Sequence, residues 1–308
     1  MKKKTKIVVV GIGGVGGYYG GLLAKKYSDS KDVEIIFVAR GEHLKQIQAK
    51  GLKVITGKDE FIAVPTLATD NANEIGIADY ILMCTKSYDL EATIEQIKPC
   101  IDENTFLLPL LNGVDGNERI KNILPNTTIL SGCVYIVSRL KEAGVVENSG
   151  NIQSLYFGID NIINDRLLLL EKLFKDANID TKLSDKISSI VWKKFIFISS
   201  SATATSYFDS SFGKLVSETK ETIVQLIEEV KAIALAKGIC LDEEITTKTL
   251  NQIKALPYET TSSMHSDFKN LKSNTEVESL TGYIVKTGKQ LNIPTPTFNK
   301  AYKKLTNK

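Results

Sequence analysis

A glycine-rich segment directly after a short apolar run carries the clearest chemical signal in the chain. The run from Ile7 to Val10 is typical of a buried parallel strand, and glycines with the spacing of a dinucleotide-binding turn follow it. Such a turn needs one glycine to bend, one to let the backbone approach a pyrophosphate, and one to pack the next helix closely. The candidate cofactor-binding residues are Gly11, Ile12, Gly13, Gly14, Val15 and Gly16. A flexible glycine loop without a ligand is the alternative interpretation.

Arg40 follows the second predicted strand, 34–39, where an NAD site usually carries Asp or Glu for the ribose 2′-hydroxyl. A guanidinium can pair with a 2′-phosphate, which an acidic side chain would repel. The sequence therefore favours NADP (NADPH) over NAD, with a surface arginine at a strand end as the alternative.

Two more polar residues follow predicted strands, at the edge where open α/β sheets bind ligands. Lys86 comes after the apolar run 81–84, and Asn112 stands before Gly113 after the run 106–110. The amide of Asn112 can both donate and accept hydrogen bonds near a nicotinamide. Taken singly, each residue is more often part of an ordinary turn.

The second half of the chain offers candidates for proton transfer and substrate binding. Lys193 and Lys194 begin an apolar helix, and one of them is expected to face the crevice between two domains. Partial desolvation near a cationic nicotinamide would lower the pKa of such a lysine, so that it could protonate a developing alkoxide. A solvated lysine at a helix end is the competing interpretation. Further on, Ser263 and Glu276 precede or open helical stretches, where the same residue types also serve as helix caps and first-turn charges.

The elements that must position these residues follow two different patterns. Short apolar runs alternate with amphipathic stretches up to about residue 180, which predicts an open, doubly wound α/β sheet of the Rossmann type. The predicted strands lie near 6–10, 34–39, 61–64, 80–84, 106–110 and 128–134, with extra strands in 134–160. From 184 on, helical periodicity dominates, with helices expected over 217–237, from about 277, and over 298–305. We therefore predict a dinucleotide-binding domain over 1–183 and an all-helical domain over 184–308.

Composition excludes several classes of protein. The 308 residues are 43% hydrophobic and 24% charged, as in an ordinary soluble protein of about two domains. A net charge of +3 with only four arginines argues against nucleic acid as a partner. Lys2 to Lys4 followed by an uncharged stretch resembles a signal peptide or membrane span, but its many glycines argue against both, so we expect no membrane partner and a cytoplasmic location. Four scattered cysteines and two histidines predict neither disulfides nor a metal site.

Taken together, the order and spacing of these motifs resemble the ketopantoate reductase family over nearly the whole chain. The landmarks are the glycine turn at 11–16, Arg40, Thr85-Lys86, Asn112-Gly113, Trp192 to Lys194, Ser262-Ser263-Met264 with Asp267, and Thr275-Glu276 followed by Gly282. The resemblance implies a Rossmann domain joined to an all-helical domain. It also implies NADPH-dependent reduction of a small 2-oxo acid substrate, 2-dehydropantoate, to pantoate. A homodimer is implied by the resemblance alone, since the residues leave the oligomeric state open.

Roles for single residues are also implied by the resemblance. Lys194 looks like the general acid, Glu276 like the carboxylate that binds the substrate hydroxyl and orients the lysine, and Ser263 like the residue that holds the substrate carboxylate. Asn112 and Lys86 match positions that contact nicotinamide, ribose or substrate.

The chain departs from the family pattern at three positions. Ile198 and Ala202 stand one and two turns after Lys194, where asparagines are common, and Thr281 stands where an Asn before the glycine is common. Loss of hydrogen-bonding amides should weaken binding of a polar oxo acid, by about 1–3 kcal/mol for each partner left unpaired. The alternatives are therefore a reductase of a less polar 2-oxo acid or ketone, and a non-catalytic NADP-binding sensor.

Overall fold

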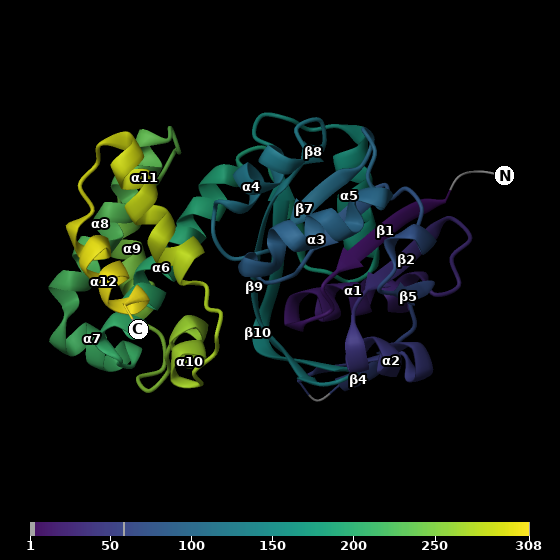
Figure 1. The fold of residues 1–308 in the computed structure, drawn as a ribbon, viewed down its shortest axis with the longest axis horizontal. Coiled ribbons are helices and arrows are strands. Elements are labelled where there is room, and N and C mark those ends of the chain that lie inside the picture. The colour runs from purple at the N-terminus through teal and green to yellow at the C-terminus, as the bar shows by residue number, and fades with distance from the viewer. Residues whose placement is uncertain (1–3, 58, 308) are drawn as a thin grey trace. The chain divides into compact units, whose positions relative to one another are not determined.

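The computed structural model describes residues 4–57 and 59–307 and divides into two compact units (Figure 1). Residues Met1–Leu111 and Gly116–Ile187 form the first unit, and residues Asn112–Asp115 and Ser188–Lys308 form the second. The second unit thus combines most of the region 184–308 with a short loop from much earlier in the chain.

Six parallel strands form the main sheet of the first unit, in the order β5-β2-β1-β6-β7-β8. They are β1 (Thr5–Val10), β2 (Val33–Val38), β5 (Leu67–Thr69), β6 (Tyr80–Met83), β7 (Phe106–Pro109) and β8 (Thr128–Ile129). The strand order reverses between β1 and β6, as in a doubly wound sheet, which confirms the predicted Rossmann-type fold. Ile7 and Val9 belong to one hydrophobic core, and Val8 and Val10 belong to another. Because both faces of β1 are buried, the strand is apolar throughout from Ile7.

Helices cover both faces of this sheet. They are α1 (Gly14–Tyr27), α2 (Gly41–Lys50), α3 (Leu90–Ile97) and α4 (Gly116–Ile123). The core that contains Val8 also contains Leu90 and Ile94 of α3 and Ile120 of α4, so these two helices pack on one face. The core that contains Ile7 includes the tyrosines of α1, which packs on the other face.

A second sheet, of five strands, corrects two of the predicted strands. It consists of β3 (Leu52–Thr56), β4 (Asp59–Ala63), β9 (Ser131–Glu142), β10 (Val145–Gly158) and β11 (Thr181–Leu183), with helix α5 (Asp165–Asp176) before its last strand. The strand predicted near 61–64 is β4, which pairs with β3 in this sheet. The strand at the edge of the parallel sheet, next to β2, is β5. The strand predicted over 128–134 is two strands, β8 and the start of β9. Alternating burial in β4 reflects an edge strand with one solvated face, which an apolar run alone does not distinguish from a central strand.

Helix α1 lies between the two sheets, and its glycines make this possible. Five of its 14 residues are glycine. A Cβ added at Gly20 would lie 3.1 Å from the ring of Phe37 in β2. A Cβ added at Gly17, toward the other sheet, would lie 2.5 Å from a methyl of Val146 in β10. Side chains on α1 would therefore push both sheets away.

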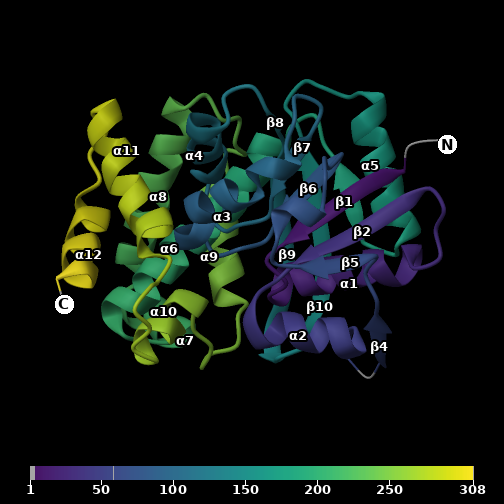
Figure 2. The same cartoon turned by 45° about the vertical axis from the view of Figure 1, so that its right-hand side comes forward.

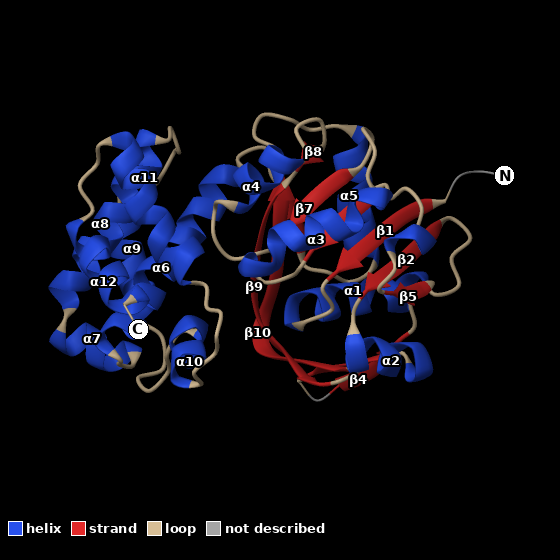
Figure 3. Cartoon of the chain, viewed as in Figure 1, coloured by secondary structure: helices blue, strands red, loops and turns tan. Residues whose placement is uncertain are grey.

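Between residues 188 and 307, the second unit consists of helices and loops, with no strand among the described residues (Figures 2 and 3). Its helices are α6 (Ile187–Phe208), α7 (Phe212–Glu218), α8 (Lys220–Ala236), α9 (Ile245–Lys254), α10 (Ser263–Lys269), α11 (Tyr283–Leu291) and α12 (Pro296–Thr306), with a π-helical turn over Glu278–Gly282. Helix α8 packs against α7, α9, α11 and α12 and presents Ile227, Val230 and Ile233 to the core. The helix predicted over 217–237 is mainly α8, because α7 ends at Glu218.

In the part of the chain that the structure describes, no helix combines the length and apolar character needed to cross a membrane.

Candidate active site

The glycine turn is held closely between neighbouring backbone segments. Gly11 donates from its N–H to the carbonyl of Val38 (3.0 Å) and has a φ of +86°, which favours glycine. A Cβ added at Gly16 would lie 2.1 Å from the carbonyl oxygen of Gly11 and 2.8 Å from the Cβ of Cys84. The turn and the start of α1 can therefore adopt this arrangement only without a side chain at residue 16.

Gly13 differs from these glycines because space is open beside it. Among the described residues other than its two chain neighbours, none has an atom within 4 Å of the position that a Cβ would take, and Gly13 is the N-cap of α1. The first helical hydrogen bond runs from the N–H of Gly17 to the carbonyl of Gly13 (2.8 Å), so the amides of residues 14–16 precede the helical ladder. An open backbone beside the positive end of a helix fits the pyrophosphate of a dinucleotide.

Thr85 is a site candidate that the sequence interpretation treated only as part of a landmark. Its buried hydroxyl oxygen forms no hydrogen bond with the described part of the chain, and its methyl lies 2.8 Å from the Cβ position of Gly11. Lys86 is exposed and begins a short 3-10 turn over Ser87–Asp89. A buried hydroxyl that lacks a partner beside the glycine turn is what a bound polar group would satisfy.

Arg40 lies directly after β2, as predicted, and forms the N-cap of α2. Its side chain is 84% exposed, and its guanidinium Nη2 lies 3.6 Å from Oδ2 of Asp89. A long, exposed ion pair of this kind contributes little to stability. The guanidinium is therefore available to bind a phosphate group.

His43 was not among the predicted site residues, although it contacts the glycine turn. Its Nε2 lies 2.7 Å from the carbonyl oxygen of Ile12, and the N–H of Gly144 donates to its Nδ1 (2.8 Å). Burial lowers the pKa of His43, and the hydrogen bond to Ile12 offsets part of that effect. A histidine at the start of a helix carries no sequence signal for a contact with Gly144, so only the fold reveals it.

Lys194 and Asn112 lie together in the second unit. The half-buried ammonium of Lys194 donates to Oδ1 of Asn112 (3.1 Å). Although Asn112 follows a strand of the first unit, it belongs to the helical unit. Lys194 lies inside α6, two turns from its first residue, rather than at the helix start as predicted. The ammonium carries three N–H donors, and the bond to Asn112 fixes the direction of one of them. The pair can therefore present a cationic proton donor of fixed orientation.

Glu276 stands next to an unusual piece of backbone. It is 2% exposed, and its carbonyl accepts from the N–H of Leu280 (3.0 Å) at the start of the π-helical turn. The Cβ position of Gly113 lies 3.5 Å from the Cβ of Ser279, so the loop that carries Asn112 packs on this turn. Wide helical turns of this type often occur at functional sites. The structure thus groups the loop of Asn112 with Lys194 and with the turn that follows Glu276.

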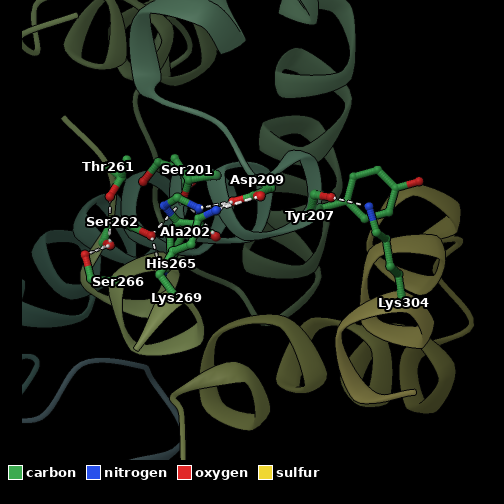
Figure 4. A network of polar contacts seen from close by, with 11 residues as sticks. Ser201, Ala202, Tyr207, Asp209, Thr261, Ser262, His265, Ser266, Lys269 and Lys304 are labelled. Carbon is green, nitrogen blue, oxygen red and sulfur yellow. Dashed lines mark hydrogen bonds and ion pairs between the residues drawn. The ribbon is translucent and has the colours of Figure 1, made fainter. Parts of the chain in front are cut away.

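Ser262 and Ser263 have different roles in the local structure. Ser262 caps α10 by accepting from the N–H of His265 (3.1 Å; Figure 4). Its hydroxyl also bonds that of Thr205 (2.7 Å). Ser263 is the first residue of α10 and is exposed. The cap interpretation therefore holds for Ser262, and the hydroxyl of Ser263 is accessible.

An ion-paired cluster fixes α10 to the end of α6. Asp209, at a φ of +52°, accepts from Nε2 of His265 (2.7 Å) and from Lys269 (2.8 Å; Figure 4). Lys269 and, to a smaller extent, His265 lower the pKa of Asp209. This cluster holds the segment of Ser262 and Ser263 in place.

The three positions that depart from the family pattern have different environments. Ile198 is half-buried and Ala202 is 4% exposed, both on the helical face of Lys194. Thr281 is fully buried, and its hydroxyl bonds that of Thr203 (2.7 Å). Its polar group therefore has a partner within the helical core, whereas Ile198 and Ala202 offer only apolar surface.

Comparison with known families assigns both parts of the chain. Residues 7–161 match the family described as "Ketopantoate reductase PanE/ApbA", and residues 186–308 match its C-terminal region, "Ketopantoate reductase PanE/ApbA C terminal".

Individual relatives match this chain over nearly their whole length. The oxidoreductase YkpB of Bacillus subtilis is 28% identical over 303 residues, which cover 97% of each chain. The 2-dehydropantoate 2-reductase of Aquifex aeolicus is 26% identical over 306 residues, covering 95% of this chain and 93% of the relative. The crystal structure of 2-dehydropantoate 2-reductase from Porphyromonas gingivalis superposes with a TM-score of 0.88 at 35% identity, covering 99% of this chain and 100% of that chain.

Proposed function

Because this chain belongs to the ketopantoate reductase family, we propose that it reduces 2-dehydropantoate to pantoate with NADPH, a step of pantothenate and coenzyme A biosynthesis. The observation that carries the proposal is the half-buried ammonium of Lys194 bonded to Asn112, beside the turn that follows Glu276. Reduction of a 2-oxo acid needs a proton donor of this kind at the carbonyl oxygen.

The first unit supplies residues that fit the cofactor. The open backbone at Gly13 and the amides at the start of α1 would hold the pyrophosphate, and the guanidinium of Arg40 would pair with the 2′-phosphate. The unpartnered hydroxyl of Thr85 and the exposed Lys86 would contribute further polar contacts. When bound, NADPH would supply the hydride that adds to the substrate carbonyl carbon.

Residues of the second unit would perform the acid–base step. The ammonium of Lys194 would bind the carbonyl oxygen and transfer one proton to it as negative charge develops there. Asn112 orients the ammonium by accepting one of its N–H groups. Glu276 would bind the substrate hydroxyl, and Ser263 would bind the substrate carboxylate. After the transfer, the neutral lysine recovers its proton from water.

The direct test is NADPH oxidation at neutral pH with 2-dehydropantoate beside other branched 2-oxo acids. We expect 2-dehydropantoate to give the highest kcat/KM in this panel. Tight NADPH binding without oxidation by any oxo acid would contradict the proposal.

Cofactor preference gives a second test. We expect Arg40→Ala to weaken NADPH binding roughly 10- to 100-fold and to leave NADH binding unchanged, because a charge-assisted hydrogen bond to the 2′-phosphate contributes about 1.5–3 kcal/mol. Lys45→Ala is the matched control, since Lys45 is an exposed cation on the same helix. Equal losses for NADPH and NADH would show that Arg40 does not read the 2′-phosphate.

A less polar 2-oxo acid is the second candidate substrate. Ile198 and Ala202 place apolar surface on the same face of α6 as Lys194, where a polar hydroxy-oxo acid would gain no hydrogen bonds. If this candidate is correct, oxo acids with larger alkyl groups will exceed 2-dehydropantoate in kcat/KM.

A homodimer and a cytoplasmic location stay predictions.

A further inference from the structure

The two hydrogen bonds of His43 define its protonation state. The backbone N–H of Gly144 can only donate, so Nδ1 of His43 must be an unprotonated acceptor. The ring proton therefore lies on Nε2 and is donated to the carbonyl of Ile12. Both ring nitrogens form hydrogen bonds only in this neutral tautomer. Protonation of Nδ1 would place its N–H opposite the N–H of Gly144, with no acceptor for either.

Through these bonds, His43 connects three segments that are far apart in the sequence. Ile12 lies inside the glycine turn, between Gly11 and the open backbone of Gly13. Gly144 lies in the turn between β9 and β10 at a φ of +80°, and its Cβ position is 2.8 Å from the Cβ of Gln46 in α2. The ring of His43 therefore holds the glycine turn to α2 and to the β9–β10 turn.

Both groups that form hydrogen bonds with the ring of His43 are uncharged backbone groups. From the glycine turn the carbonyl of Ile12 faces the ring, and from the β9–β10 turn the amide of Gly144 faces it. Glu42 and Lys45, its neighbours on α2, and Glu142, before the β9–β10 turn, are exposed. Among the described residues no ion pair involves His43, so burial dominates and lowers its pKa.

We propose that His43 is a positioning residue of the dinucleotide site, and that its neutral ring keeps the Ile12–Gly13 backbone in the conformation that receives the pyrophosphate. Protonation releases the bond from Gly144 and frees the glycine turn, so cofactor affinity falls in acid. The inference rests on the proposed function only in taking NADPH as the ligand.

The test compares the pH dependence of NADPH affinity in two proteins that differ only in a titrating ring. Glutamine can accept and donate through one amide but does not titrate, so His43→Gln should bind NADPH within about threefold of the parent at pH 7.5. Between pH 7.5 and 5 the parent should lose several-fold more affinity than His43→Gln, with the transition below 6.5 because burial lowers the pKa of the ring. The 2′-phosphate of NADPH titrates in the same range, but equally in both proteins.

Controls separate positioning from general loss of structure. His265→Gln removes the other histidine of the chain and should keep the steep pH profile of the parent. His43→Ala should bind NADPH more weakly at every pH and lack the acid transition. Parallel curves for the parent and His43→Gln would overturn the inference, whereas absence of NADPH binding by the parent at all pH values would overturn the proposed function.

A measurement without ligand tests the same geometry. Because the folded chain binds a proton at His43 more weakly than the unfolded chain does, the free energy of unfolding should fall as pH drops below 6.5 and level off once the folded ring is protonated. His43→Gln should remove this contribution. Nitrogen NMR of the ring should show the proton on Nε2 at neutral pH, and a proton on Nδ1 would contradict the proposal.

Discussion

Lys194→Ala should lower the kcat for reduction of 2-dehydropantoate by about 10²- to 10⁴-fold, because a positioned general acid contributes this much to a proton transfer. The change removes the ammonium that Asn112 orients and leaves the glycine turn of the other unit untouched. The dissociation constant of NADPH should therefore stay the same. Steady-state NADPH oxidation and fluorescence titration with NADPH measure the two quantities.

Lys193→Ala provides the matched control for this experiment. Lys193 is the neighbouring lysine on α6 but is exposed, so its removal should change kcat by less than about twofold, as for most surface substitutions. Asn112→Ala should lie between the two variants, since the lysine would remain without its orienting acceptor. If Lys194→Ala turned over 2-dehydropantoate as fast as the parent, the assigned chemistry would be wrong.

The largest effect on stability is expected for Gly16→Ala. Its Cβ would lie 2.1 Å from the carbonyl oxygen of Gly11, a backbone atom that cannot move without reshaping the turn. Such overpacking should cost about 3 kcal/mol or more in the free energy of unfolding, measured by denaturant titration. NADPH binding should be lost along with the turn.

Gly13→Ala separates the role of the glycine turn in folding from its role in binding. Beyond its chain neighbours, no described residue comes within 4 Å of the added Cβ, so the free energy of unfolding should change by less than about 1 kcal/mol. The methyl would nevertheless occupy the open side of the turn and weaken NADPH binding. Unchanged NADPH affinity in Gly13→Ala would place the pyrophosphate elsewhere.

Local sequence pattern was sufficient for the parts of the fold that depend on short-range rules. The run Ile7 to Val10 followed by spaced glycines predicts the strand, turn and helix that the structure contains, because each requirement lies within a few residues. The strand near 61–64 was assigned to the wrong sheet, since its partner is chosen by the distant packing of the second sheet on α1. Periodicity identifies a strand but not its neighbour.

The candidate site shows the same limit. Lys194 and Asn112 were each singled out from local sequence, but their hydrogen bond joins residues 82 positions apart. The contacts of His43 and the bond between Thr203 and Thr281 join residues from separate elements and have no local signal. Spacing therefore predicted which residues could do chemistry, and only the packed chain showed which of them meet.

The glycine-rich helix α1 has a consequence for the order of events during synthesis. Each of its five glycines costs roughly 1 kcal/mol of helix stability relative to alanine, so the segment Gly14–Tyr27 has little tendency to form a helix by itself. Val146 of β10, which packs against Gly17 of this segment, leaves the ribosome long after the segment itself. The nascent chain should therefore not form this helix until β10 has emerged, and the glycine turn would be among the last features of the first unit to form.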